Sequence, residues 1–475
     1  MKNKNLFVLL FFFSVVVFNI YLYLHANIEL NEDRKWVTIG EHLYKYGVYS
    51  LGVIDPNGYY IPTFYTPPVY PIICFVVFCV FGIDQVAYDV IQIITILMNF
   101  GIVYFTYRIG KLFSYKIGCV AAFLAALDLS LFHWAYDYIV PDTILAFFSI
   151  ISLFFLVKFI KDENSYKNLI LSSLFLCIAS WTKTSIFMLW LPLTVFLLVY
   201  LYMHKRTLTA KKIYLLISFF VIMQIVFWGG WKIRNYYVTG YPEFSCQAGE
   251  VALLWNSPYL ISYQEGVSFS EAARMIYEKY ITDEEQKLAE GELDEGALNL
   301  YKLNIAKKII LESPVDYAVV ILRRIPKLLL GSPPPDWLFN KEQSERIYEK
   351  YSKVPSQLLA LKELLAEGYI FYVFLWGFIK VHLFFVYFMS LVSIVVIFYK
   401  NRSDMWVLIG MLLIVIYFFT LCSPASHDRY RGPIMPIFYF LSGYGLIWLG
   451  KVFQQFINSR ANLIKPESLN KDNVL

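Results

Sequence analysis

Long apolar stretches alternate with short polar ones along most of this chain. An α-helix needs about 20 mostly apolar residues to cross ~30 Å of hydrocarbon. Stretches of this kind predict spanning helices at residues 6–25, 87–110, 115–132, 139–160, 167–183, 185–203, 211–231, 378–398, 404–422 and 431–450. The chain is therefore expected to be an all-α polytopic membrane protein with about 10 to 11 transmembrane helices.

Two further stretches near the N-terminus predict helices that do not cross the membrane. In the first, apolar residues recur at helical spacing among charged ones: Trp36, Ile39, Leu43 and Tyr46. That pattern is typical of a helix lying on the membrane surface. The second, residues 67–82, is apolar but short and begins with three prolines, so it also predicts a surface helix. Both would lie in a first outer loop, residues 26–86.

The basic residues orient these helices. Lysine and arginine are enriched in cytoplasmic loops, and the arrangement above places the following on one, inner side: Lys2, Lys4, Arg108, Lys111, Lys116, Lys158, Lys161, residues 204–212, Lys400, Arg402 and Lys451. The first span, which lacks a small-residue cleavage site, is interpreted as a retained helix. Four parts follow: a transmembrane module at 1–231, an extracytoplasmic, mainly helical domain at 232–370, transmembrane helices at 371–450 and a cytoplasmic tail at 451–475.

Smaller features complete the predicted outline. Helical signals within the outer domain cover residues 268–290, 296–312 and 314–330. The apolar stretch 369–399 exceeds one crossing, so its first part is expected to continue on the surface before 378–398 spans. The tail is expected to be loose.

The overall composition agrees with a membrane protein. Hydrophobic residues make up 58% of the chain and charged residues only 16%, proportions that the wet surface of a soluble domain excludes. No basic stretch interleaved with aromatic residues indicates nucleic-acid binding. The six cysteines show neither metal-ligand nor redox spacing, and most lie in apolar stretches as small core residues.

Two acids follow the first predicted span. Glu32 and Asp33 come directly after Asn31. They could simply complement the dipole at the start of the surface helix. Alternatively, one of them is a general base that removes a proton from an acceptor hydroxyl. A helix start also mounts such a side chain at a fixed position, so the two interpretations are compatible.

Two charged residues mark the outer ends of later helices. Asp142 follows Pro141 at the start of a predicted span, where a carboxylate is costly and often functional. It could hold an acceptor hydroxyl, bind a divalent ion together with the first acids, or cap the helix. Lys183 separates two spans, and could be a cation for a phosphate at headgroup level or a lysine that extends to the interface.

Positive charge is normally depleted from short outer loops, yet residues 423–433 contain Arg429 and Arg431. A guanidinium binds phosphate with two parallel hydrogen bonds and stabilises the charge that develops as a phosphate leaves. A lipid headgroup or a salt bridge with Asp428 would be the alternative partner. Arg234, just after Trp231, could be a second phosphate contact or an interface anchor.

The order of these motifs resembles the GT-C class of integral-membrane glycosyltransferases. The motifs are an acidic pair after the first span, Pro67-Pro-Val-Tyr-Pro71, the acid at Asp142, Trp231-Lys-Ile-Arg-Asn235 and a late Arg429-Tyr-Arg-Gly-Pro433. The chain is similar to the protein O-mannosyltransferase and aminoarabinose transferase group, including its bacterial RgtA/B/C/D-like branch. The resemblance covers about residues 1–240 and 420–450.

The resemblance implies a helical membrane fold and a sugar donor carried on a polyprenyl phosphate. The first-loop acid of the family falls on Glu32 or Asp33, although members usually have Asp before Glu. Its later acid falls on Asp142, and its basic tail loop on Arg429 and Arg431. Lys183 stands where members often have a basic residue, and Trp36 where an aromatic residue follows the acids. Residues 240–370 match no family motif, and acceptor choice is expected there.

The predicted function is an inverting glycosyl transfer to an acceptor hydroxyl on the outer face. Glu32 or Asp33 would be catalytic, and the substrate-binding residues would be Asp142, Lys183, Arg234, Arg429 and Arg431. Replacing Arg431 with alanine is expected to abolish transfer in a folded protein. No cofactor is required, although a divalent metal would be compatible.

Partners and location follow from the same hypothesis. The expected partners are the lipid-linked donor, membrane lipids and a lipid, glycan or protein acceptor, and the short tail without an organelle signal favours a bacterial plasma membrane. Two alternatives stay open. A ligase or polymerase of lipid-linked polysaccharide would have the same architecture. A transporter would instead show broken helices and internal repeats.

Overall fold

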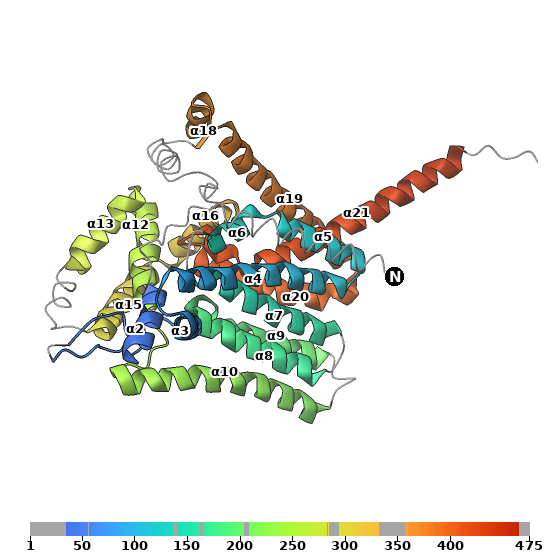
Figure 1. Cartoon of the computed structure of the whole chain (residues 1–475). Coiled ribbons are helices and arrows are strands. Elements are labelled where there is room, and N and C mark those ends of the chain that lie inside the picture. The colour runs from blue at the N-terminus through green and yellow to red at the C-terminus, as the bar shows by residue number, and fades with distance from the viewer. Residues whose placement is uncertain are drawn as a thin grey trace, which may run out of the picture.

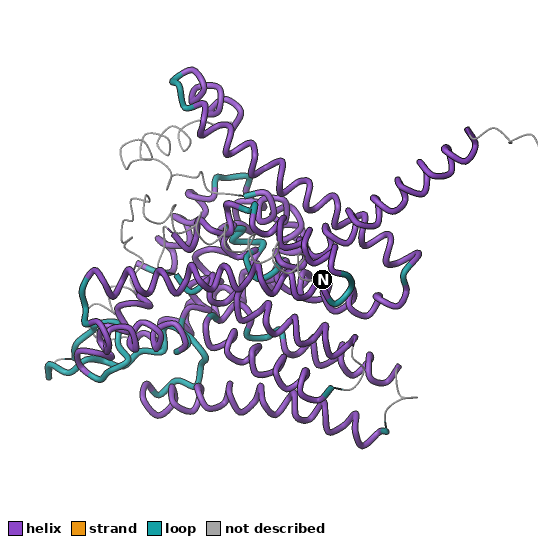
Figure 2. The backbone as a smooth tube through the Cα atoms, turned by 45° about the vertical axis from the view of Figure 1, so that its right-hand side comes forward, coloured by secondary structure: helices purple, strands orange, loops and turns teal. Residues whose placement is uncertain are grey.

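The computed structural model describes residues 35–55, 57–136, 140–161, 165–203, 209–282, 284, 294–331 and 357–464. Throughout these ranges the chain is helical and forms no strand, apart from one isolated bridge between Ile54 and Tyr60. Figure 2 shows the helices joined mostly by short loops. The all-α prediction is confirmed.

The body of the molecule is a bundle of long apolar helices that run in nearly one direction (Figure 1). Within the described ranges, seven helices are long and apolar enough to cross a membrane: Gln85–Lys111, Asp142–Lys161, Thr184–Met203, Tyr214–Thr239, Ile370–Lys400, Arg402–Cys422 and Met435–Ser459. Two more predicted spans correspond to shorter helices, α5 (Tyr115–Ala126) and α8 (Tyr166–Thr182). The predicted first span lies outside the described residues.

Nine helices of the described chain form the bundle. Besides α5 and α8, they are α4 (Gln85–Lys111), α7 (Asp142–Lys161), α9 (Trp190–Met203), α10 (Ala210–Thr239), α19 (Ile370–Lys400), α20 (Met405–Cys422) and α21 (Met435–Ile464). Their buried aliphatic and aromatic side chains form one continuous core. This continuous core fixes how the helices lie relative to one another.

The predicted span 115–132 is interrupted. Helix α5 ends at Ala126, and a short helix, α6 (Leu129–Tyr136), follows. Asp128 lies between them, and its Oδ1 accepts a hydrogen bond from the backbone N–H of Ser130 at 3.0 Å. An aspartate that bonds the backbone two residues ahead competes with helix continuation, which explains the break.

The two predicted surface helices are present as α2 (Lys35–Tyr46) and α3 (Val69–Phe81). They pack closely, because a side-chain carbon at Gly40 would lie only 2.7 Å from Cβ of Cys74. Trp36 anchors α2 by donating a hydrogen bond from its indole to Thr66 Oγ1 at 2.9 Å. Their position on a membrane surface stays a prediction.

Residues 247–282 and 294–331 form a group of shorter helices at one end of the bundle (Figure 1). In chain order these are α11 (Gln247–Glu250), a π-helical turn at Val251–Asn256, α12 (Ser257–Glu265), α13 (Phe269–Tyr280), α15 (Glu295–Glu312) and α16 (Pro314–Leu330). The helical signals at 296–312 and 314–330 are confirmed, and α13 covers the first part of the signal at 268–290, whose last part lies mostly outside the described residues.

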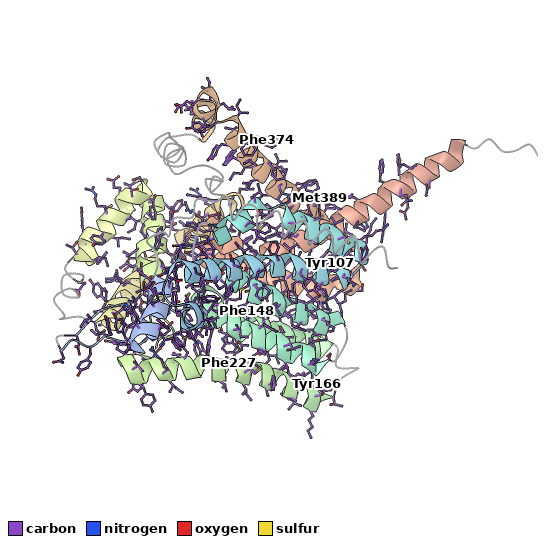
Figure 3. All side chains as sticks on the ribbon, viewed as in Figure 1. Tyr107, Phe148, Tyr166, Phe227, Phe374 and Met389 are labelled. Carbon is purple, nitrogen blue, oxygen red and sulfur yellow. The ribbon has the colours of Figure 1, made fainter. Side chains whose placement is uncertain are left out.

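Three predicted helix ends are wrong. Helix α10 does not stop at residue 231 but continues to Thr239, where Gly240 ends it with φ of 80°. Helix α19 is uninterrupted from Ile370, so residues 370–377 are not a separate surface segment. Helix α21 continues to Ile464, so the tail begins as helix and not as a loose segment. After α18 (Gln357–Ala366), α19 stands partly away from the body, where Phe374 is labelled in Figure 3.

Candidate functional site

Four of the sequence-predicted side chains gather at one end of the bundle. Asp142, Arg429 and Arg431 line a small cavity of about 20 Å³ between α6, the first turn of α7 and the loop before α21. Lys183 joins them by pairing with Asp142. These residues are far apart along the chain, so the fold itself assembles the cluster.

The centre of the cluster is a buried ion pair. Lys183 donates from Nζ to Asp142 Oδ1 at 2.6 Å, and both residues are less than a tenth exposed. The second oxygen of Asp142, Oδ2, is buried without a hydrogen-bond partner within the described residues. A buried carboxylate oxygen ordinarily has a partner, so Oδ2 can accept one hydrogen bond from a substrate group.

Local structure positions both members of the pair. Asp142 is the first residue of α7, and its Oδ1 accepts from Lys183. Lys183 ends α8 in an extended conformation, which turns the chain into the next helix. Its ammonium also lies 4.8 Å from the ring centre of Tyr430, a cation–π contact. The pair therefore joins α7, α8 and the basic loop.

The two arginines of the loop have different surroundings. Arg431 is 2% exposed, and its guanidinium donates to Leu329 O at 2.9 Å, to Gly331 O, and to Ser130 Oγ at 2.6 Å. Burial acts to lower the pKa of Arg431, but neighbouring anionic groups raise it overall, so it stays charged. Arg431 thus joins the loop to the end of α16 and to α6.

Arg429 lies against aromatic rings instead. Its guanidinium carbon is 5.3 Å from the ring centre of Tyr430 and 5.8 Å from that of Trp134, and the side chain lines the cavity. Stacked guanidinium groups keep their planar edges for anions. Of the two arginines, Arg429 is the better placed to bind a phosphate.

One charged residue that lines the cavity, Asp128, was not among the site residues predicted from the sequence. Asp128 is 1% exposed and accepts hydrogen bonds from Ser130 and, through its Oδ2, from Tyr439. Since Ser130 also receives a hydrogen bond from Arg431, Asp128 supports the arginine through one hydroxyl. The available signal was a carboxylate inside a predicted span, which is costly unless it has partners.

A second acid, Asp428, stabilises the loop from its other side. Trp134 donates from its indole to Asp428 Oδ2 at 3.0 Å, and His427 Nδ1 lies 3.0 Å from Asp428 Oδ1. Arg324 of α16 also donates to Pro424 O at 3.2 Å and to Ser426 Oγ. The loop is therefore connected on both flanks, which fixes the position of Arg429.

Arg234 lies outside this cluster. Near the end of α10 it donates to Thr63 O at 2.8 Å and to the Asn235 side chain at 3.1 Å. Its guanidinium carbon is 5.0 Å from the ring centres of both Tyr49 and Trp231. These contacts attach α10 to the segment after α2, and the structure does not bring Arg234 to Asp142 or Lys183.

The catalytic candidates Glu32 and Asp33 lie outside the described residues. The described chain begins two residues later, and Trp36 shares a buried cluster with Trp134, Val140 and Ile144. Trp134 also lines the cavity. The start of α2 therefore packs beside the same part of the molecule as the ion pair.

A metal site is not evident within the ranges that the structure covers. There, no group of three or more histidine, cysteine, aspartate or glutamate side chains is arranged to hold an ion.

Part of the sequence and the fold are similar to those of known proteins. Residues 65–231 match the family model described as dolichyl-phosphate-mannose-protein mannosyltransferase. The matched segment contains α3 to α10 almost completely, including Asp142 and Lys183. The match covers less than half of the chain and shows that this part is similar to that family. No curated protein matches the sequence.

The fold is similar to that of a solved glycosyltransferase structure. The oligosaccharyltransferase AglB from Archaeoglobus fulgidus, in complex with an inhibitory peptide and a dolichol-phosphate, aligns with 96% of this chain at a TM-score of 0.52 and 13% identity. The chain spans about half of that protein, 52% of its length. ArnT from Cupriavidus metallidurans bound to undecaprenyl phosphate aligns with 92% of this chain and 77% of its own at 14% identity, with a TM-score of 0.38.

Proposed function

We propose that the protein transfers a sugar from a polyprenyl-phosphate donor to an acceptor hydroxyl, with inversion, on the outer face of the membrane. The observation that carries this proposal is the buried Lys183–Asp142 pair beside Arg429. Buried cations are costly unless they have partners. Within the described residues Lys183 pairs with one acid, Asp142, and Arg429 lies against aromatic rings, so the cluster is suited to receive a phosphate.

The chemistry needs a base and an anion site. An acceptor oxygen loses its proton to a carboxylate and attacks the anomeric carbon of the sugar, while the bond from that carbon to the phosphate oxygen breaks. The phosphate leaves with the bonding electrons, and its charge is stabilised by Lys183 and Arg429. Attack and departure on opposite faces of one carbon invert its configuration.

The base is proposed to be Asp33 or Glu32. The support is the cluster that places Trp36 beside Trp134, since Trp134 lines the cavity. Asp142 has a different role in this proposal. Its Oδ1 orients Lys183, and its Oδ2 accepts a hydrogen bond from a hydroxyl of the acceptor or the sugar. A divalent ion held jointly by Asp142 and the first acids would serve the same leaving phosphate.

The outer location rests on the direction of α7. Its 20 residues rise ~30 Å from Asp142 to Lys161. Lys161 lies at the opposite end with Lys400 and Lys451, which line one cavity there. Because clustered lysines mark the cytoplasmic side, the end that carries Asp142 would face outward. We place the protein in a bacterial plasma membrane.

A ligase or polymerase of lipid-linked polysaccharide is the alternative function that one observation supports. AglB is an oligosaccharyltransferase, and its fold covers nearly the whole of this chain. A donor that carries an oligosaccharide or a polysaccharide, as in a ligase or polymerase, would use the same cations. The difference between the two hypotheses is the length of the glycan on the donor.

The test is the release of free polyprenyl phosphate by purified protein from a panel of synthetic donors, each carrying one sugar. Wild type is compared with Asp33→Asn, Glu32→Gln and Lys183→Met. Release that one acid variant and the lysine variant both lose would support the proposal and identify the base. If wild type released nothing from any one-sugar donor, with membrane extract as acceptor, but acted on an oligosaccharide donor, the ligase alternative would replace it.

A further inference from the structure

A second cavity lies at the end of the bundle opposite the candidate site. It has a volume of about 380 Å³ and is bounded by the last turns of α7 and α19, the starts of α5 and α20, and the middle of α21. In Figure 3, Tyr107 and Tyr166 mark this end on α4 and α8. Three lysines from three helices line the cavity, namely Lys161, Lys400 and Lys451.

The first of these lysines is neutralised. Lys161 donates to Asp404 Oδ1 at 2.6 Å, and Asp404 is 4% exposed. The other oxygen of Asp404 accepts from Asn401 at 2.9 Å and from Tyr444 at 3.1 Å. Both oxygens of the acid therefore have partners, and Lys161 is the lysine that pairs with it.

The other two lysines keep their charge available. Both are exposed, and no carboxylate forms an ion pair with either one within the described part of the chain. Lys400 lies 5.2 Å from the ring centre of Trp448, which also lines the cavity. The starts of α5 and α20 add the partial positive charge of helix N-termini. The cavity therefore presents an uncompensated positive charge.

Apolar side chains form another part of the wall. Val396, Ile447 and the indole of Trp448 line the cavity beside the lysines. Lys161 and Lys400 stand where membrane-length helices end, since α7 and α19 both finish there. A ligand at this level has an anionic group next to a hydrocarbon portion, the combination that an anionic phospholipid offers.

We propose that this cavity binds the phosphate of an anionic phospholipid headgroup from the leaflet opposite the candidate site. Lys400 and Lys451 contact the phosphate, and Trp448 and Val396 contact the first part of the acyl chains. Lys161 with Asp404 fixes the floor of the cavity. The site is separate from sugar transfer, and it stands whether or not the proposed activity is found.

The experiment measures lipid retention by the full-length protein in detergent. Native mass spectrometry counts bound phosphatidylglycerol or phosphatidylcholine during titration with each lipid. Wild type is expected to retain one phosphatidylglycerol at least tenfold more tightly than phosphatidylcholine. The Lys400→Gln/Lys451→Gln double variant loses this preference, whereas Lys400→Arg/Lys451→Arg, which keeps both charges, retains it.

The matched control removes two lysines at the same end but outside the cavity. Lys211→Gln/Lys212→Gln, at the start of α10, keeps the preference if the cavity is the site. An equal loss in this control would overturn the proposal, because it would indicate only general attraction to basic surface. Displacement of the bound lipid by millimolar inorganic phosphate would also overturn it, since the ligand would then be free phosphate.

Discussion

The two ends of the bundle carry positive charge in opposite ways. At the end with Asp142, the cations Lys183 and Arg431 are almost entirely buried and enclosed by acids, carbonyls and rings. At the other end, Lys400 and Lys451 are exposed, and of the three cavity lysines only Lys161 has an acid partner among the described residues. Exposed lysines at a helix end cost little in folding, so their charge needs no compensating partner.

Buried cations do need an explanation. Moving a charge out of water costs several kcal/mol, and geometry must compensate for it. A chain gains nothing in folding from such a pair over apolar residues of similar size. The contrast therefore supports the proposal that the end with Asp142 retains its charges for a ligand. At the other end the charge of Lys400 and Lys451 costs little in folding, so only its arrangement around the cavity can indicate a ligand there.

The largest expected effect is on Lys183. Lys183→Met removes the cation nearest the proposed phosphate, so donor cleavage should fall roughly 100- to 1,000-fold. The variant also leaves Asp142 buried and unpaired, which should lower the free energy of unfolding by about 3–5 kcal/mol. Release of polyprenyl phosphate and thermal unfolding in detergent measure the two effects separately.

The control for this prediction removes both charges. Asp142→Asn/Lys183→Met leaves no uncompensated charge, so thermal stability should return towards wild type while donor cleavage stays lost. If the double variant regained activity together with stability, the pair would be structural, and the contrast between the two ends would no longer indicate a site.

The next prediction separates the two arginines of the loop. Arg429→Ala should reduce donor cleavage roughly 10- to 100-fold, the value of one or two charged hydrogen bonds, with little change in unfolding. Arg431→Ala should instead lower the free energy of unfolding by about 3 kcal/mol, because it leaves Ser130 and the α16 carbonyls unpaired. Thermal unfolding and cleavage assays on both variants measure this. Equal instability in both would refute the distinction.

Asp128 should show a smaller, structural effect. Asp128→Asn weakens the bonds from Tyr439 and Ser130, so the free energy of unfolding should fall by about 1–3 kcal/mol. Donor cleavage should fall only because Arg431 is then held less firmly. Tyr439→Phe, which removes one of the same bonds, serves as the comparison. A larger loss of activity than Lys183→Met causes would make Asp128 a participant in the reaction.

The smallest effect is expected at Arg234, which belongs to neither charged cluster. Arg234→Ala removes its hydrogen bond to Thr63 O, so unfolding should become easier by about 1 kcal/mol and cleavage should change less than about threefold. Lys232→Ala, on the same helix, is the control. A loss of cleavage comparable to that of Arg429→Ala would restore Arg234 as a phosphate contact.

Much of the fold could be predicted because apolar length and helical spacing are local properties. The spans at α4, α7, α9 and α20 follow directly from them. Helix ends were less predictable. Trp231 looked like an interface residue where α10 stops, but the helix continues to Thr239 because nothing before Gly240 breaks it. Asp128 looked like part of a span, although its bond to Ser130 N ends the helix there.

The candidate site was predictable in its residues more than in their roles. Asp142, Lys183 and Arg429 were conspicuous as charges at the outer ends of apolar stretches, and the structure brings them together. Arg431 and Arg234 looked equally suited to phosphate. Their partners, the carbonyls of Leu329 and Thr63, lie far away in sequence and leave no local trace. The pattern of side chains along the sequence does not show which backbone carbonyl an arginine will reach.

The hydrogen bonds from Arg431 to Leu329 and Gly331 have a mechanical consequence. They fasten the last turn of α16 to a loop that carries Arg429 two residues away, and Arg324 fastens the same helix to Pro424. These hydrogen bonds hold the end of α16 and the loop together, so a displacement of α16 would be passed on to the loop that carries Arg429.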